Sequence, residues 1–269
     1  MKEELIQRLK NEGIWAKKSL GQNFLVDDLA LNKIVEAAEV RAGDKILEIG
    51  PGLGVLTERL LERGAEVLAV EKDENLAGKL ETRFSGKKLR VLAKDILDFD
   101  PNKNDLVDYK IVANIPYYIT GRILEKFLSG EKKPNSMVIL VQEEVANRIC
   151  DGAGSMSLLS VSVHFYGKPE KVAKIPKESF FPVPGVNSAI LKVSDIGIKY
   201  PKVDEKKFFL LVKMGFSSRR KTLLNNLKMG SQISSEELSG IIEKIGFNRL
   251  TRAQELSTGD WINLFYEIN

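Results

Sequence analysis

Apolar and polar positions follow two alternating patterns over the first half of the chain. Apolar runs of five or six residues, typical of buried strands, alternate with segments in which apolar residues recur every three or four positions, as on one face of a helix. The expected helices cover residues 29–39, 55–63, 74–84, 121–128 and 142–150, and the expected strands cover 45–49, 66–70, 89–93, 109–113 and 136–141. This alternation predicts a doubly wound, Rossmann-like α/β sheet with parallel strands.

The pattern changes in the second half of the chain. Residues 159–166 and 188–193 read as strands without a long helix between them, which predicts an antiparallel hairpin that completes the sheet. After residue 194 the helical period returns, with expected helices at about 204–214, 219–228, 235–245 and 258–267. The sequence therefore predicts an α/β domain over residues 1–195 and a small all-helical domain over residues 196–269.

Composition removes several kinds of chemistry. Cys150 is the only cysteine and His164 the only histidine, so disulfides within the chain and metal sites built on Cys or His clusters are excluded, and we expect no metal. His164 falls in the predicted strand 159–166, where a structural role is expected for it. Residues 1–12 predict a charged amphipathic helix rather than a signal peptide, and no apolar run could cross a bilayer, which predicts a cytoplasmic protein.

The distribution of charge says more than the net charge of +4. Between residues 199 and 228, nine Lys or Arg stand against two acids, an excess of seven positive charges. The basic residues are densest in the segment Phe216-Ser217-Ser218-Arg219-Arg220-Lys221-Thr222. A run of charge usually forms a solvated face, but its position in a small appended domain favours contact of Arg219, Arg220 and Lys221 with a phosphate backbone.

The predicted strand 45–49 leads into Gly50-Pro51-Gly52-Leu53-Gly54, and a predicted helix follows. Strand, glycine turn and helix bring a nucleotide-like ligand close to backbone amides. Val55 stands where the dinucleotide fingerprint needs its third glycine, and the Lys-Ser/Thr pair of a phosphate-binding P-loop is missing. The motif is therefore G-x-G-x-G, which fits neither of those sites.

Acids follow the next two strands. Glu71 ends the strand 66–70, and Asp95 comes shortly after the strand 89–93. In a doubly wound sheet these positions lie at the ligand-binding edge, where Glu71 can accept hydrogen bonds from both ribose hydroxyls and Asp95 lies near the adenine edge. An adenosine-containing cofactor is expected, and G-x-G-x-G with these acids is typical of S-adenosylmethionine-dependent methyltransferases.

The strand 109–113 ends in Asn114-Ile115-Pro116-Tyr117. The amino nitrogen of adenine is a poor nucleophile because its lone pair is delocalised into the ring. If the Asn114 side-chain oxygen and the Ile115 carbonyl each accept one N–H, the lone pair can turn toward a methyl donor. Pro116 has no N–H that could compete for those acceptors, and Tyr117 offers a face on which the base can stack.

Two loops leave alternatives open. The stretch 17–25 is either a surface loop before a helix that starts at Asp27 or Asp28, or a lid that contacts the ligand through Asn23. The proline-rich segment 180–188 is either a surface connection with a buried Phe, or a loop whose aromatic residue closes over a flipped base.

Taken together, these motifs resemble the ribosomal RNA adenine N6-dimethyltransferases, the KsgA (RsmA) family, over nearly the whole chain. The matching segments are Leu20-Gly21-Gln22-Asn23-Phe24-Leu25, residues 48–54, Asn114-Ile115-Pro116-Tyr117, the F-x-P-x-P-x-V-x-S set (Phe180, Pro182, Pro184, Val186, Ser188), Arg219-Arg220-Lys221-Thr222 with Asn225-Asn226-Leu227, and Arg252-Ala253-Gln254-Glu255-Leu256-Ser257. One departure is Met156-Ser157, where bacterial members usually carry Tyr-Gly. It concerns one loop on the substrate side.

The resemblance implies transfer of four methyl groups from S-adenosylmethionine to two adjacent adenosines in the 3′-terminal hairpin loop of 16S rRNA. It further implies work on the small (30S) ribosomal subunit, a role in subunit biogenesis, and a monomer. The target adenosine would be unpaired or flipped into the pocket.

Carried over by position, the resemblance assigns cofactor contacts to Asn23, Leu25, Gly50, Gly52, Glu71, Asp95 and Asn114. It assigns the catalytic site to Asn114, Ile115, Pro116, Tyr117 and Phe180. Asn23 and Leu25 would close over the cofactor, Gly50 and its neighbours would hold the methionine part, and Tyr117 and Phe180 would stack on the target base.

Two other functions remain open. An adenine N6-methyltransferase that modifies large-subunit rRNA, of the macrolide-resistance type, shares the glycine turn, the Asn114 turn and the Phe180 loop, although the segment 219–227 argues against it. A non-catalytic ribosome-assembly or transcription factor could use the same fold, but the intact Asn114 turn and acids indicate that catalysis is retained.

Overall fold

The computed structural model describes residues 3, 5, 7, 11, 21–230 and 233–268. The helix predicted over residues 1–12 and the beginning of the loop predicted at 17–25 lie largely outside this set. The chain divides into two compact units, one formed by Met1–Ala146 and Gly167–Gly197 and the other by Asn147–Tyr166 and Ile198–Asn269. Within the described residues, no helix is both long and apolar enough to span a membrane.

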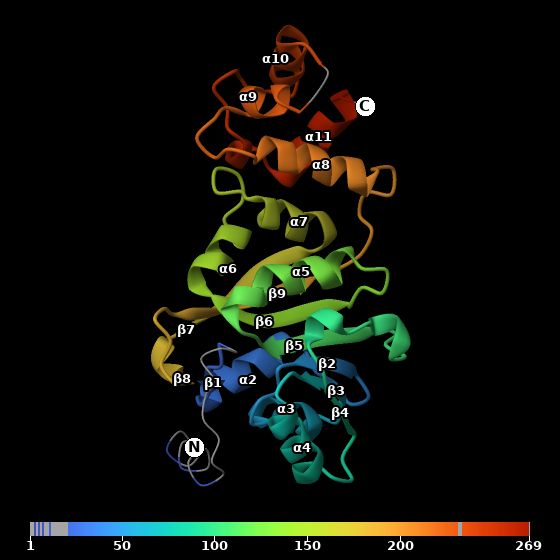
Figure 1. The fold of residues 1–269 in the computed structure, drawn as a ribbon, viewed down its shortest axis with the longest axis vertical. Coiled ribbons are helices and arrows are strands. Elements are labelled where there is room, and N and C mark those ends of the chain that lie inside the picture. The colour runs from blue at the N-terminus through green and yellow to red at the C-terminus, as the bar shows by residue number, and fades with distance from the viewer. Residues whose placement is uncertain are drawn as a thin grey trace. The chain divides into compact units, whose positions relative to one another are not determined.

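The first unit is built on a sheet with the strand order β4-β3-β2-β5-β6-β9-β7 in the described part of the chain (Figure 1). In that order the strands are β4 (Leu89–Ala93), β3 (Glu66–Glu71), β2 (Lys45–Ile49), β5 (Tyr109–Asn114), β6 (Ser136–Gln142), β9 (Ser188–Ser194) and β7 (Lys168–Ile175). The neighbouring strands from β4 to β6 pair in parallel. Strand β9 pairs antiparallel with both β6 and β7. The predicted doubly wound α/β class is confirmed.

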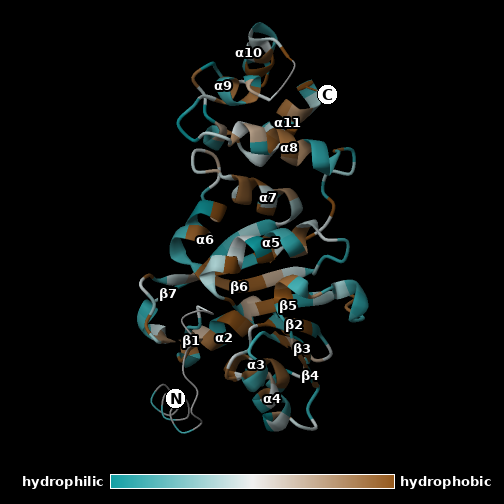
Figure 2. Cartoon of the chain, in the orientation of Figure 1, coloured by the Kyte–Doolittle hydropathy of each residue, from teal (hydrophilic) through white to brown (hydrophobic). Residues whose placement is uncertain are grey.

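Helices cover both faces of this sheet. They are α2 (Asp28–Ala37), α3 (Val55–Glu62), α4 (Glu74–Arg83) and α5 (Thr120–Ser129). Helix α6 (Glu143–Cys150) follows β6 and runs from the first unit into the second. α2, α3 and α4 share one apolar cluster with the strands. Because β2-α3-β3 and β5-α5-β6 run in opposite directions across the sheet, right-handed crossovers put α5 on the other face. Strands covered on both faces need continuous apolar runs, as β5 and β6 show in brown in Figure 2.

Short elements connect these layers. Strand β1 (Phe24–Leu25) pairs antiparallel with β8 (Phe180–Phe181), with Leu25 opposite Phe180. The 3-10 turns are η2 (Ile96–Asp98), η3 (Pro101–Lys103), η4 (Tyr117–Ile119), η5 (Lys177–Ser179) and, in the second unit, η6 (Ala253–Glu255). Asp27 caps α2 by accepting the amides of Leu29 and Ala30, which confirms the expected start of that helix.

The strand predicted at 159–166 was wrong. These residues form helix α7 (Leu158–Tyr166), and the hairpin that ends the sheet is made by β7 and β9. The segment is apolar on most sides and largely buried, so alternation and helical period could not be told apart. The signal that was missed is the serine before the helix. Ser157 Oγ accepts the Ser160 amide at 3.2 Å, as the N-cap residue of a helix does.

Helix α7 also changes the division of the chain. The predicted boundary at residue 196 lies close to the start of Ile198–Asn269, but the second unit additionally contains Asn147–Tyr166. The reason is aromatic packing: the Phe165 ring stacks on Phe208 at 4.8 Å, and the Tyr166 hydroxyl donates to Glu205 at 2.9 Å. The α/β unit is therefore discontinuous in sequence.

The other helices of the second unit are α8 (Glu205–Gly215), α9 (Leu223–Lys228), α10 (Ser235–Lys244) and α11 (Thr258–Ile268). They agree with prediction except that α9 begins at 223 rather than 219. Thr222 caps α9 by accepting the Asn225 amide, so Arg219, Arg220 and Lys221 lie in the preceding loop instead of on a helix. His164 contacts the Ile149 carbonyl through Nε2 at 2.8 Å, a structural contact.

Candidate active site

A cavity of about 180 Å³ lies at the carboxyl edge of the sheet in the first unit. Its lining comes from β1, the glycine turn after β2, the ends of β3, β4 and β5, and the start of α5. Of the residues selected from the sequence, it brings together Asn23, Leu25, Gly50, Gly52, Glu71, Asp95, Asn114, Ile115, Pro116 and Tyr117. Phe180 is not among the lining residues.

The glycine turn, residues 50–54, is sharp because Gly50, Gly52 and Gly54 have φ angles of +66°, +56° and +75°. Residues with a Cβ rarely adopt such angles. Gly54 is also closely packed: an added Cβ would lie 2.5 Å from Leu80 Cδ2 and 2.8 Å from Phe84 Cε2. Helix α3 follows without a side-chain cap, so the turn presents backbone rather than side chains to a ligand.

Glu71 joins the end of β3 to the glycine turn. Its Oε2 accepts the Gly52 amide at 3.0 Å, and its Oε1 accepts the Asp73 amide at 2.9 Å. Burial raises the pKa of the Glu71 carboxyl, and these amide hydrogen bonds oppose the increase. The carboxylate thus fixes the turn and retains lone pairs that a ribose diol could use.

Glu48 on β2 belongs to the glycine motif, but no role was predicted for it from the sequence. The side chain is 1% exposed and lines the cavity, and among the described residues neither of its carboxyl oxygens has a hydrogen bond of standard geometry. Burial raises the pKa of Glu48 to about 8, and the charge of Glu71 adds to this against the opposing effect of Thr57. A buried carboxyl without a partner is costly, and a cationic ligand group would satisfy it.

Asp95 is oriented by two contacts. Its Oδ2 accepts a hydrogen bond from Lys72 Nζ at 2.8 Å, and its Oδ1 accepts the Leu97 amide at 2.9 Å. The hydrogen bond from Lys72 lowers the pKa of Asp95 against the effect of partial burial. The carboxylate is therefore ionised and held in place at the cavity wall.

Asn114, at the end of β5, is held by the segment that precedes α2. Its Nδ2 donates to the Asn23 carbonyl at 3.1 Å. Because a carbonyl oxygen accepts hydrogen bonds but cannot donate one, this contact fixes which end of the Asn114 amide is nitrogen. Oδ1 is then the end left to accept a hydrogen bond from a ligand. The contact also favours the lid interpretation of residues 21–25 over a plain surface loop.

Tyr117 is held by a residue of strand β9. Its hydroxyl and Ser188 Oγ form a hydrogen bond of 2.7 Å, and Ser188 is fully buried on β9. Burial raises the pKa of the Tyr117 hydroxyl, against the effect of the Ser188 hydrogen bond. Ser188 was visible as the last residue of its motif, but its contact with a residue 71 positions away has no local sequence signal.

Phe180 lies elsewhere. Its side chain is 1% exposed and belongs to the apolar cluster beneath α2, α3 and α4. The interpretation of residues 180–188 as a connection with a buried Phe describes this arrangement. Stacking of Phe180 on a target base would need the loop to rearrange, so this role stays a prediction.

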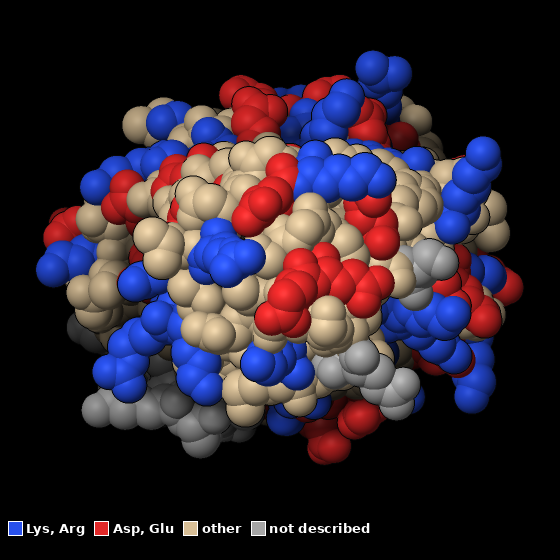
Figure 3. Space-filling model, turned by 90° about the horizontal axis from the view of Figure 1, so that it is seen from above, with Lys and Arg blue, Asp and Glu red and all other residues tan. Residues whose placement is uncertain are grey.

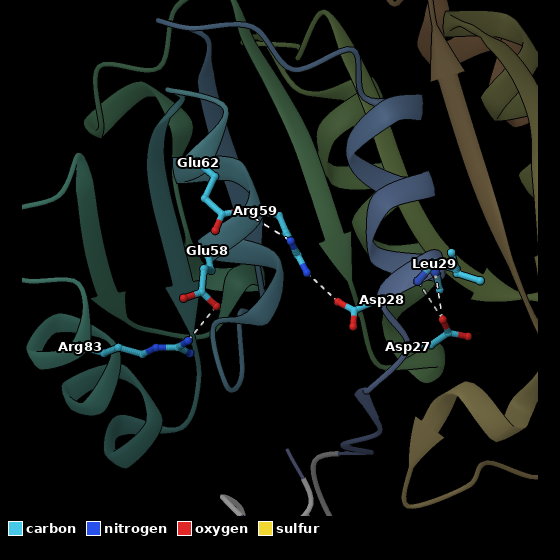
Figure 4. A network of polar contacts seen from close by, with 8 residues as sticks. Asp27, Asp28, Leu29, Glu58, Arg59, Glu62 and Arg83 are labelled. Carbon is cyan, nitrogen blue, oxygen red and sulfur yellow. Dashed lines mark hydrogen bonds and ion pairs between the residues drawn. The ribbon is translucent and has the colours of Figure 1, made fainter. Parts of the chain in front are cut away.

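Ion pairs brace the helices around the glycine turn (Figure 4). Arg83 on α4 donates to the Leu53 carbonyl and to Glu58 Oε2, each at 2.8 Å. Arg59 on α3 pairs with Asp28 at 2.6 Å. Arg83 therefore fixes the outgoing half of the turn, a positioning role that sequence analysis missed because its contact lies 30 residues away.

The basic loop, residues 216–222, lies in the second unit. Asn226 Nδ2 donates to the carbonyls of Gly215 and Ser218 at 2.6 and 3.0 Å, and Ser217 Oγ donates to Asn226 Oδ1. Arg219 and Arg220 are exposed above this buried amide. Figure 3 shows one face of the molecule, on which Lys and Arg stand in separate groups divided by acidic and uncharged residues. Basic charge is thus presented locally rather than as one continuous field on that face.

The strand order, the cavity with its glycine turn and acids, and the Asn114 turn define a Rossmann-like methyltransferase. The family model for ribosomal RNA adenine dimethylase matches residues 14–269, and the chain belongs to that family. The protein is therefore an enzyme that modifies ribosomal RNA and needs a methyl donor.

Similar proteins agree with this assignment. The chain is 43% identical over 256 residues to ribosomal RNA small subunit methyltransferase A of Dehalococcoides mccartyi, covering 94% of this chain and 88% of the relative. The Protochlamydia amoebophila protein of the same name is 38% identical over 275 residues, covering 98% and 95%. The crystal structure of a dimethyladenosine transferase from Plasmodium falciparum is 25% identical with a TM-score of 0.77, covering 91% and 97%. That of the 23S rRNA methyltransferase ErmE is 26% identical with a TM-score of 0.74, covering 91% and 99%.

Proposed function

We propose that this enzyme transfers methyl groups from S-adenosylmethionine to N6 of two adjacent adenosines in the 3′-terminal hairpin loop of 16S rRNA, four groups in all. The observation that carries the proposal is the orientation of Asn114, whose Nδ2 is engaged by Asn23 and whose Oδ1 is left for an amino group inside a cavity that also holds Glu71 and Asp95. The relatives named small subunit methyltransferase A support the choice of subunit.

The residues present fit S-adenosylmethionine. The buried Glu48 carboxyl, which has no hydrogen bond of standard geometry within the described residues, suits an ammonium group. The backbone of Gly50 and Gly52 suits the methionine part, and Glu71 suits a ribose diol. Asp95 suits the adenine amino group. When bound, this cofactor supplies an electrophilic methyl group on a sulfonium.

The chain's own contribution to the reaction is positioning. Asn114 Oδ1 and the Ile115 carbonyl would each accept an N–H of the target amino group, which turns its lone pair out of the ring plane. Pro116 offers no competing N–H, and Tyr117, fixed by Ser188, offers a stacking face worth roughly 1–3 kcal/mol. No general base is needed, because the amino nitrogen becomes cationic on methylation and its proton can leave to water. Catalysis then comes mainly from orientation.

Substrate binding is assigned to the second unit as well. Arg219, Arg220 and Lys221 would contact phosphates of the 30S subunit, which accords with their exposure on a loop held by Asn226. We further propose that the enzyme acts as a monomer in the cytoplasm, where its ribosomal substrate is found, without a metal, and that it serves small-subunit biogenesis.

A second candidate substrate is large-subunit rRNA, since ErmE, a 23S rRNA methyltransferase, has a similar fold at 26% identity. The segment from Arg219 to Leu227 favours the small subunit. The test is tritiated-methyl transfer to small subunits and to large subunits, both taken from a strain that lacks the modification, followed by mapping of the modified adenosines. Label at N6 of two adjacent adenosines near the 3′ end of 16S rRNA is expected; label confined to 23S rRNA would replace the proposal by the alternative.

A further inference from the structure

Two exposed side chains at the rim of the cavity have no part in the reaction described above. Tyr118 and Arg122 both line the cavity, yet the Tyr118 side chain is 63% exposed and Arg122 is exposed as well. Tyr117, one position earlier, is half-buried and tied down through its hydroxyl. Adjacent tyrosines therefore have different surroundings, and within the described residues only the first makes a protein contact through its hydroxyl.

Tyr118 is fixed on one side and open on the other. It lies on η4, directly after the Asn114 turn, and its ring lies against Gly21, where an added Cβ would come within 3.1 Å of Tyr118 Cε1. In the described part of the chain its hydroxyl makes no hydrogen bond. A ring that is braced at one edge and exposed on the rest is suited to stacking on a nucleobase.

Arg122 occupies a position that the helix itself disfavours. It lies in the first turn of α5, where the helix dipole repels a cation, and this turn contains no acid and has no side-chain cap. Among the described residues, Arg122 makes no ion pair or hydrogen bond. Its charge also lowers the pKa of Asp95, but the Asp95 carboxylate is already engaged by Lys72. An exposed guanidinium without a partner is available to a phosphate.

We propose that Tyr118 and Arg122 form a subsite for the nucleotide next to the target adenosine, with Tyr118 stacked on its base and Arg122 on its phosphate. This inference rests on the proposed function, because it needs an RNA strand whose target base enters the cavity. Single-stranded RNA offers both groups at each step, an unstacked base and a phosphate. The subsite is continuous with the reaction centre, since Tyr118 directly follows Tyr117.

The test compares Tyr118→Ala, Tyr118→Phe and Arg122→Gln in methyl transfer to unmethylated small ribosomal subunits. Tyr118→Ala and Arg122→Gln should each raise the KM for subunits about tenfold with kcat nearly unchanged, and Tyr118→Phe should behave like wild type. Arg122→Gln should also reduce the salt dependence of log KM by about 0.7 per log unit of salt, whereas Tyr118→Ala should not.

The matched control is Arg63→Gln. Arg63 is an exposed arginine at the end of α3, which starts at the glycine turn and runs to the opposite edge of the sheet. Its loss should leave the KM unchanged. Dissociation constants for S-adenosylmethionine are measured in parallel, and the subsite requires that they stay constant in every variant.

Two results would overturn the subsite. One is an unchanged KM in both Tyr118→Ala and Arg122→Gln; the other is weaker S-adenosylmethionine binding, which would assign the two residues to the cofactor. Wild type is assayed first on both subunits, so a failure of the proposed function is seen separately. If only large subunits are methylated, the same variants are compared on that substrate.

Discussion

The cavity of the first unit and the basic loop of the second present charge in opposite ways. In the cavity, Glu48 and Glu71 are buried carboxyls whose pKa values are raised by burial. On the loop, Arg219 and Arg220 are exposed, and only the backbone beneath them is fixed, by Asn226. Buried groups act at short range and are little screened, whereas exposed charges are screened by salt. Substitutions of groups inside the cavity should therefore alter turnover or cofactor binding at any salt, and those of exposed charges, in the loop or at the cavity rim, should alter substrate affinity in a salt-dependent way.

The largest effect is expected for Asn114→Ala, a substitution inside the cavity. It removes the acceptor that orients the target amino group, and we expect kcat to fall about 10²- to 10³-fold, as when one oriented hydrogen-bonding group is lost from a reaction centre. The KM for ribosomal subunits should change little, because the basic loop is untouched. Single-turnover transfer of tritiated methyl groups measures the first quantity and steady-state kinetics the second. Near-normal turnover with both substrates bound would disprove the mechanism.

A second prediction concerns the glycine turn. Gly54→Ala adds a Cβ at a φ of +75° and places it 2.5 Å from Leu80 Cδ2, so both backbone strain and overpacking apply. Gly43→Ala adds a Cβ at a φ of +86° with nothing within 4 Å of it, so backbone strain applies there without overpacking. We expect the free energy of unfolding to fall by about 3 kcal/mol for Gly54→Ala and about 1 kcal/mol for Gly43→Ala. Urea denaturation measures this difference.

Cofactor affinity separates the two glycine variants further. Calorimetric titration with S-adenosylmethionine should show weaker binding for Gly54→Ala, because the turn next to the cavity must shift, and unchanged binding for Gly43→Ala. Equal losses of stability in the two variants would mean that the close contact with Leu80 and Phe84 does not matter.

The same comparison explains what could be predicted from the sequence. β2, β3, β4 and β5 end in a glycine turn or a polar residue, and because parallel strands end at one edge, local motifs sufficed to predict that Glu71, Asp95 and Asn114 meet there. Contacts between distant segments had no such signal. The hydrogen bond between Ser188 and Tyr117 and that from Arg83 to the Leu53 carbonyl depend on how separate elements pack. The burial of Phe180 beneath α2 depends on the same packing.

The second unit was harder to predict for a different reason. Its residues 158–166 are apolar on most sides, so neither a period of two nor one of 3.6 stands out, and packing against Phe208 and Glu205 decides the outcome. The basic cluster was found from charge alone, but its loop conformation was not, because the cap at Thr222 and the buried amide of Asn226 fix it.

The third prediction tests the contribution of the basic loop to substrate binding. Arg219→Gln with Arg220→Gln should raise the KM for small subunits about tenfold at physiological salt and reduce its salt dependence by about 0.7–0.9 per charge removed. The kcat and the affinity for S-adenosylmethionine should stay constant. Lys206→Gln with Lys207→Gln is the matched control, since it removes two exposed charges of the same basic stretch from α8, outside the loop. An equal effect of this double variant would show that net charge, not the loop, binds the substrate.

A fourth prediction concerns a pH dependence of stability that arises from Glu48. Its pKa is about 8 in the folded protein, against 4.5 for a free carboxyl. Between these values the folded state keeps a proton that the unfolded state has released, so the free energy of unfolding decreases as the pH rises. This contribution is complete below pH 4.5 and is lost as the pH approaches 8, with a slope of at most about 1.4 kcal/mol per pH unit.

Glu48→Gln isolates this contribution, because glutamine has nearly the same shape and does not titrate. Urea denaturation at pH 6, 7 and 8 without cofactor should show a decline with pH in wild type and a flatter profile in Glu48→Gln. Some decline should persist, since the raised pKa of Glu71 acts in the same direction. The lowered pKa values of Asp27 and Asp95 act only in the acidic range and do not interfere. Identical slopes in the two proteins would mean that the pKa of Glu48 is not raised in the folded protein, which would contradict this prediction.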